Sequence, residues 1–181
     1  MLNFKFYKPE TLLCFPKISA ELFNTHKDKF NVNERGAVLL KWSKENFLDL
    51  YDEINSLIKP LGIHVTVSRF FVTPPNGRIG VHVDSHEINP GAYALNIPIL
   101  IDTKDHIMNW FDYDGEVFSK VTPTYNKAIA PLNPEKLQLS ASHLLIGPAY
   151  VQVGVFHEVV NTSSIPRIVL SIRFSNSFKL D

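Results

Sequence analysis

The hydrophobic positions of the chain follow a helical pattern first and an extended pattern later. From Ser43 to about Pro60, apolar residues recur at helical spacing, with Ser43 as the N-cap and Gly62 as the stop signal. The recurring residues are Phe47, Leu48, Tyr51, Ile54, Leu57 and Ile58. This spacing predicts one amphipathic helix.

After Gly62 the pattern changes to short β-branched and aromatic runs between turn signals such as Asp114-Gly115. Eight candidate strands lie near 64–73, 79–84, 92–101, 106–111, 116–121, 143–146, 150–160 and 167–175. The proline-containing segment 122–134 is expected to be a long surface loop. The sequence therefore predicts a mainly β fold, a double-stranded β-helix or cupin-like jelly roll, with the N-terminal helix packed on one sheet.

The length of 181 residues is enough to bury the core of one domain. We expect residues 1–62 to form a helical or mixed N-terminal extension and residues 63–176 to form the jelly-roll core. No run approaches the length of apolar chain that spans a bilayer, so no membrane partner is expected. The pattern specifies no oligomeric state.

The balance of charges and the cysteine content argue against several classes of function. Eighteen Lys and Arg balance eighteen Asp and Glu, which argues against a nucleic acid partner or an anionic membrane surface. Cys14 is the single cysteine and rules out an internal disulfide. The start of the chain lacks the apolar stretch of a secretory signal, so we expect a cytoplasmic protein.

A candidate metal site combines two distant segments. In the strand GVHVD, His82 and Asp84 are two positions apart and therefore point to the same side of the sheet. His157 lies near the start of a later strand, just after Gly154. Two imidazoles and one carboxylate form a facial set of three ligands that leaves positions open, which suits Fe(II) and oxygen chemistry. Alone, the His-x-Asp pair is equally compatible with an ordinary surface pair.

The strand RIVLSIRFS adds a candidate anion site. Arg167, Ser171 and Arg173 share one of its sides, and the apolar residues share the other. A guanidinium matches a carboxylate with two hydrogen bonds, so either arginine could anchor a keto acid, with a further hydrogen bond from Ser171. If the predicted helix covers the apolar side, the arginines line the interior of the barrel; otherwise they point to water.

Together, HVD at 82–84, the second histidine and the arginine ten positions later resemble the pattern of the 2-oxoglutarate- and Fe(II)-dependent oxygenases. The segment HEVVNTSSIPRIVLSIRF is most similar to the aspartyl/asparaginyl β-hydroxylase branch, although that branch typically lacks the carboxylate that Asp84 supplies. The resemblance implies that His82, Asp84 and His157 hold Fe(II) and that Arg167 binds the distal carboxylate of 2-oxoglutarate. It makes Asn96, in ALNIPI, a further pocket residue.

The resemblance implies a dioxygenase that hydroxylates a free amino acid, a protein side chain or a small metabolite. A cupin-like metal protein that does not use 2-oxoglutarate is the alternative, because Gly154, His157 and Asn161 also match half of a cupin motif. His86 is an alternative ligand. Arg69 and Arg78 are further candidates for contact with an anionic substrate. The expected pocket walls are aromatic: Phe70, Tyr93, Trp110 and Phe156.

Overall fold

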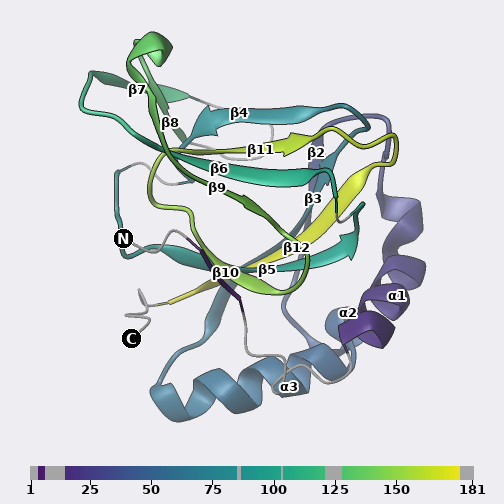
Figure 1. Cartoon of the computed structure of the whole chain (residues 1–181). Coiled ribbons are helices and arrows are strands. Elements are labelled where there is room, and N and C mark those ends of the chain that lie inside the picture. The colour runs from purple at the N-terminus through teal and green to yellow at the C-terminus, as the bar shows by residue number, and fades with distance from the viewer. Residues whose placement is uncertain (1–3, 7–14, 85–86, 103, 121–127, 176–181) are drawn as a thin grey trace.

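The computed structural model describes residues 4–6, 15–84, 87–102, 104–120 and 128–175 (Figure 1). Twelve strands and three α-helices occur in these ranges. The strands are β1 (Phe4–Phe6), β2 (Gly36–Leu40), β3 (Val65–Thr73), β4 (Arg78–His82), β5 (Tyr93–Leu100), β6 (His106–Asp112), β7 (Val117–Lys120), β8 (Ala128–Pro131), β9 (Gln138–Leu144), β10 (Ala149–Gln152), β11 (His157–Asn161) and β12 (Arg167–Phe174). The helices are α1 (Phe15–His26), α2 (Lys44–Phe47) and α3 (Asp49–Ile58), with short 3-10 turns at Lys27–Lys29, Lys59–Leu61 and Pro134–Lys136.

Two antiparallel sheets make a jelly-roll sandwich. One has six strands in the order β1-β10-β5-β12-β3-β2, and the other has four in the order β4-β11-β6-β9. A small ribbon of β7 and β8 extends beyond the second sheet (Figure 1). The predicted mainly β, cupin-like fold is confirmed.

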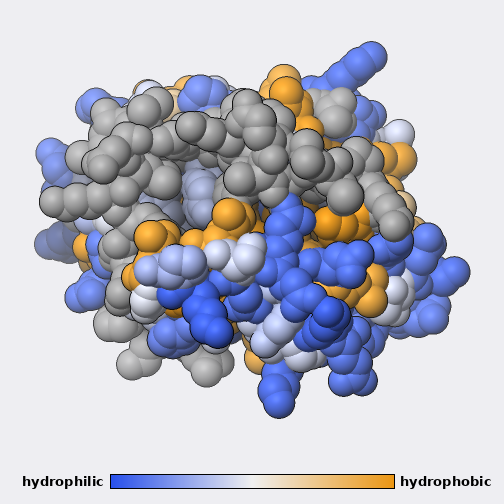
Figure 2. Space-filling model, turned by 90° about the horizontal axis from the view of Figure 1, so that it is seen from below, coloured by the Kyte–Doolittle hydropathy of each residue, from blue (hydrophilic) through white to orange (hydrophobic). Residues whose placement is uncertain are grey.

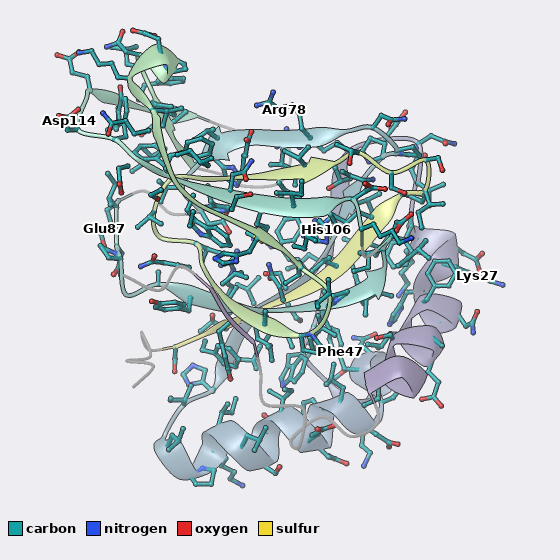
Figure 3. All side chains as sticks on the ribbon, viewed as in Figure 1. Lys27, Phe47, Arg78, Glu87, His106 and Asp114 are labelled. Carbon is teal, nitrogen blue, oxygen red and sulfur yellow. The ribbon has the colours of Figure 1, made fainter. Side chains whose placement is uncertain are left out.

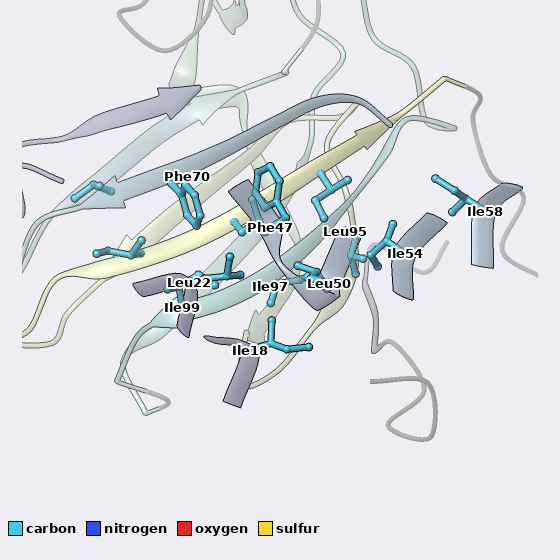
Figure 4. Close-up of a cluster of buried hydrophobic side chains, with 14 residues drawn as sticks. Ile18, Leu22, Phe47, Leu50, Ile54, Ile58, Phe70, Leu95, Ile97 and Ile99 are labelled. Carbon is cyan, nitrogen blue, oxygen red and sulfur yellow. The ribbon is translucent and has the colours of Figure 1, made fainter. Parts of the chain in front are cut away.

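Strand β12 occupies a central position in the six-stranded sheet and pairs with both β3 and β5. One side of it packs Ile168, Leu170 and Ile172 into a cluster that includes residues of all three helices. Figure 4 shows this cluster between the sheet and the helices. Complete burial of each large aliphatic side chain stabilises the fold by about 1.5–3 kcal/mol. The side that includes Arg167 faces the second sheet instead.

The helices cover the outer surface of the six-stranded sheet (Figure 1). Helix α1 contacts β5, where the Ser19 hydroxyl donates a hydrogen bond of 3.1 Å to the carbonyl oxygen of Pro98. Lys27, in the 3-10 turn that follows α1, is exposed and points away from the sheet in Figure 3. In the view of Figure 2, hydrophilic residues dominate the described surface on the α3 side, with smaller hydrophobic patches between them. In the described residues, no helix combines the length and the hydropathy needed to cross a membrane.

The predicted helix from Ser43 to Pro60 is interrupted. Ser43 does cap it, since its hydroxyl accepts a bond of 3.4 Å from the amide of Asn46, and Gly62 ends it with a φ of 68°. Leu48, however, has a φ of 53° and separates α2 from α3. Such a backbone costs of order 1–3 kcal/mol and persists because Phe47 and Leu50 are fully buried on either side of it.

Several strand predictions need correction. The single strand expected at 150–160 is two strands, β10 and β11, which belong to different sheets. The strand expected at 143–146 is β9, which begins at Gln138. The loop expected at 122–134 contains β8, and its first part, up to residue 127, lies outside the described residues. The expected N-terminal extension supplies β2 to the edge of the larger sheet.

Candidate metal centre

The ladder between β4 and β11 brings the two histidines together. His82 and His157 are direct partners in this ladder, and their ring centroids are 4.5 Å apart. Opposite residues of an antiparallel pair point to the same side of the sheet. Both side chains therefore point into the space between the two sheets, where both are buried.

Asp84 follows β4 and turns back toward these rings. Its backbone amide donates a 3.1 Å hydrogen bond to the carbonyl oxygen of Val153, in the connection that leads into β11. Its Oδ1 lies 2.9 Å from Nε2 of His82 and 3.9 Å from Nε2 of His157. One potential ligand atom from each of the three residues lies within 4.8 Å of the others, which is close enough to surround one metal ion.

The backbone determines which nitrogen of each ring faces Asp84. Nδ1 of His82 is 2.8 Å from the carbonyl oxygen of Gly80, and Nδ1 of His157 is 2.9 Å from that of Val155. A carbonyl oxygen only accepts, so Nδ1 carries the proton in both rings. Nε2 is then the nitrogen of each ring that faces the carboxylate of Asp84. This is the arrangement by which metal-binding histidines are oriented.

The surroundings keep these groups in the protonation states that a metal requires. Burial would raise the pKa of Asp84, but the Arg173 guanidinium and the two imidazoles hold it well below its usual range. Arg173 donates a hydrogen bond directly to Oδ2 of Asp84. Burial, together with the charge of His82, lowers the pKa of His157 to about 4. At neutral pH the site therefore offers a carboxylate and a neutral imidazole from these two residues.

The donor set fits a divalent cation. Oδ1 of Asp84 is buried and lies 2.9 Å from Nε2 of His82. The Nε2 atoms of His82 and His157 face it. A metal ion binds an imidazole through a nitrogen without a proton, so a cation at this position would be held by three electron-pair donors and would remove the repulsion among them.

A narrow cavity of about 30 Å³ extends from this centre between the sheets. Its lining includes the three predicted metal ligands and the four predicted cosubstrate contacts: His82, Asp84, His157, Asn96, Arg167, Ser171 and Arg173. Oδ1 of Asn96 and Oγ of Ser171 are buried without a hydrogen-bond partner among the described residues. Unsatisfied polar atoms in a cavity are costly, and they are a common sign of a binding site.

Arg167 lies deep in this cavity and is only 2% exposed. Its Nε donates a hydrogen bond to Nε2 of His106, a fully buried residue at the start of β6. Figure 3 shows His106 between the sheets. Burial and the adjacent Arg167 hold the pKa of His106 well below its ordinary value, so the ring is a neutral acceptor. Sequence reasoning missed this contact because the two residues are 61 positions apart.

Other sequence candidates have different positions. Of the four expected aromatic walls, Tyr93 lines a cavity beside the centre, while Phe156 lines a separate one. Phe70 packs under the helices, and Trp110 is a core residue whose indole nitrogen donates to the Gln152 carbonyl oxygen. His86 lies outside the described residues.

No family model matches the chain, and no curated protein is significantly similar to it in sequence. Solved structures are similar in fold. The non-heme alpha ketoglutarate dependent carbocyclase SnoK from nogalamycin biosynthesis has a TM-score of 0.55 at 12% identity, over 95% of this chain and 79% of SnoK. EvdO2 from Micromonospora carbonacea var. aurantiaca, complexed with 2-oxoglutarate, has a TM-score of 0.56 at 8% identity, over 86% of this chain and 80% of EvdO2.

A third structure is that of the epimerase SnoN in complex with Fe3+, alpha ketoglutarate and nogalamycin RO. Its TM-score is 0.52 at 12% identity, over 87% of this chain and 74% of SnoN. These likenesses define a class of fold, the cupin-like jelly roll that several iron- and keto-acid-dependent enzymes share. The aspartyl/asparaginyl β-hydroxylase branch, which the distal segment resembles, is not shown by the comparisons.

Proposed function

We propose that this protein is a non-haem Fe(II)- and 2-oxoglutarate-dependent dioxygenase that hydroxylates a small molecule or an amino acid side chain. The observation that carries the proposal is the convergence of Asp84 Oδ1 and two imidazole Nε2 atoms in one buried site, where one potential ligand atom from each residue lies within 4.8 Å of the others. His82, Asp84 and His157 would hold the metal. The structural neighbours that bind iron and keto acid support the choice of Fe(II).

The narrow cavity supports the choice of cosubstrate. A buried guanidinium at one end and a metal at the other match a molecule with an acid group at each end. Arg167 would pair with the distal carboxylate of 2-oxoglutarate, while the hydroxyl of Ser171 and the amide of Asn96 would supply hydrogen bonds along its length. When bound, Fe(II) would activate dioxygen, the oxidant; one oxygen atom would convert the keto acid to succinate and carbon dioxide, and the other would enter a C–H bond of the substrate as a hydroxyl group.

The remaining work of the protein is orientation and exclusion of water. Arg173 holds the second carboxylate oxygen of Asp84, which leaves Oδ1 directed at the metal position. His106 accepts a hydrogen bond from Arg167 and so fixes the direction of its guanidinium. Apolar residues such as Ile79, Met108 and Val159 line the cavity between the two ends and keep it dry.

Thermal melting without oxygen tests this proposal. Mn(II), an inert substitute for Fe(II), is expected to raise the Tm of the wild type, and 2-oxoglutarate is expected to raise it further only when the metal is present. His157→Ala should lose both increases. His143→Ala, a change at an exposed position of β9, is the matched control and should keep both. An increase caused by Mn(II) with no further increase caused by 2-oxoglutarate would contradict the proposal and favour a cupin that does not use the keto acid.

The variant Arg167→Ala distinguishes binding of the metal from binding of the cosubstrate. This variant is expected to keep the increase in Tm caused by Mn(II) and to lose most of the increase caused by 2-oxoglutarate. With Fe(II) and oxygen, we expect its KM for 2-oxoglutarate to rise at least about tenfold, because a buried charged hydrogen bond is worth about 1.5–3 kcal/mol. Release of succinate measures the turnover. An unchanged KM would show that Arg167 does not bind 2-oxoglutarate.

A further inference from the structure

A second and wider cavity, of about 360 Å³, meets the narrow one at the metal centre. The two cavities share Asp84, Ser171 and Arg173 in their linings. The wide cavity is therefore the space from which a substrate would approach the open side of the metal. Its size suits a small organic molecule.

Two arginines, from neighbouring strands, line the wide cavity. In the ladder between β3 and β12, Arg69 is opposite Ser171 and Arg173 is opposite Val67. The two arginines are thus diagonal neighbours on the inner side of the sheet, where Cα atoms are about 7–8 Å apart. Side chains as long as arginine can reach one ligand from such positions.

The charges around the two cavities favour an anion. Asp84 is the single acidic side chain among the described residues that line either cavity. With a divalent cation bound, the metal and four guanidinium groups exceed that one carboxylate by five positive charges; the arginines are Arg35, Arg69, Arg167 and Arg173. A keto-acid dianion neutralises two of these charges. Two of the guanidinium groups, those of Arg69 and Arg173, line the wide cavity, where Arg173 already shares Asp84 with the metal position.

The rest of the wide cavity is partly apolar. Val67, Phe71 and Phe174 line it, while Asn89 and Tyr93 provide polar groups. Burial raises the pKa of Tyr93, so its side chain remains a neutral hydroxyl that can donate a hydrogen bond. A ligand for this cavity therefore combines an anionic end with a short apolar body.

We propose that the substrate is a small molecule with an oxyanion group, a carboxylate or a phosphate, that Arg69 and Arg173 bind in the wide cavity. This inference rests on the proposed function, because it takes the open side of the metal as the place of reaction. The pairing would hold the apolar body of the molecule toward the metal and so select which carbon is hydroxylated.

Calorimetric titration of the oxygen-free protein, loaded with Mn(II) and 2-oxoglutarate, tests the inference with three probes of similar shape. Phenylacetate and phenyl phosphate carry the two kinds of oxyanion, and phenylacetamide is the neutral control. At least one anion is expected to bind about tenfold or more tightly than the amide, and the tighter of the two identifies the anionic group. Equal binding of all three probes, or binding of none at millimolar concentration, would overturn the inference.

Arg69→Gln should raise the Kd of the preferred anion about tenfold, leave that of the amide unchanged and leave Mn(II) and 2-oxoglutarate binding unchanged. Arg69→Lys keeps the charge and should recover part of the preference. Arg78→Gln is the matched control, because Arg78 projects from β4 away from the cavity and pairs with Glu158 (Figure 3). A weaker Kd for 2-oxoglutarate in Arg69→Gln would instead assign the wide cavity to the keto acid and overturn the inference.

The two failures are distinguishable through the same titrations. If the anion preference exists but neither Mn(II) nor 2-oxoglutarate binds, the proposed dioxygenase function is wrong. If metal and keto acid bind but the probes show no preference for charge, the function stands and the substrate class is wrong.

Discussion

The two sides of β12 differ in composition and in what they contribute to the protein: one packs in the hydrophobic core, and the other lines the cavities. Toward the helices the strand presents Ile168, Leu170 and Ile172, all with no exposed surface. Toward the second sheet, at positions that alternate with these, it presents Arg167, Ser171 and Arg173 around the cavities. Because the alternation of a strand separates these sets completely, stability and chemistry can be changed one at a time within a single element.

The largest effect is expected on the apolar side. Leu170→Ala should lower the free energy of unfolding by about 2–5 kcal/mol, because it opens a cavity in a fully packed cluster. Urea denaturation measures this change. The Kd for Mn(II) of the folded protein should remain that of the wild type. A Kd raised tenfold would show that the two sides of β12 are coupled.

The next largest effect is expected at Gly154, in the connection between β10 of one sheet and β11 of the other. A Cβ added to Gly154 would clash with the carbonyl oxygen of Asn89, so Gly154→Ala must displace the backbone that leads into His157. We expect a loss of about 1–3 kcal/mol in stability, as for other overpacked sites, and weaker Mn(II) binding. Gly147→Ala, where a Cβ meets nothing within 4 Å, is the control. Similar Tm values for the two variants would contradict this account.

A smaller effect concerns acid stability. The pKa of His106 is low in the folded protein, so the unfolded chain takes up its proton first as the pH falls through about 6.5. The contribution of the neutral His106 ring to the free energy of unfolding is therefore fully present above that pH and is lost as the pH falls below it. His106→Gln should reduce the decline, and the part that remains comes from His157, whose pKa is also low. The urea concentration at the midpoint of unfolding, measured between pH 7 and pH 5, gives the size of this decline. His64→Gln, at an exposed position, should leave the slope unchanged.

The sequence predicted the parts of this site that follow from alternation. Arg167 and Ser171 share a side of β12, as expected, whereas β4 ends at His82 and not at Asp84, so Asp84 reaches the centre from a bend after the strand. The apolar side of β12 does pack against the segment predicted as a helix. These relations are local, because two positions along a strand always return to the same side.

The parts that failed depend on contacts between distant segments. The alternating run 150–160 gives no sign that the chain leaves one sheet at Gln152 and enters the other at His157, apart from Gly154. Strand β9 is almost wholly exposed, with polar residues such as Gln138 and Ser140, so it has no hydrophobic pattern to detect. The contact of His106 with Arg167 leaves no signal in the local sequence, because the two residues are 61 positions apart and no motif links them.

Each candidate histidine ligand is oriented by a carbonyl group two positions earlier in its own chain segment, Gly80 for His82 and Val155 for His157. In many metal sites this task belongs to the side chain of a distant residue, which a single substitution can remove. Here the acceptor is part of the main chain and survives almost any exchange of side chains. The coordinating nitrogens should thus keep their orientation while the surrounding cavity changes from one substrate to another, a useful property in a scaffold for redesigned oxidation chemistry.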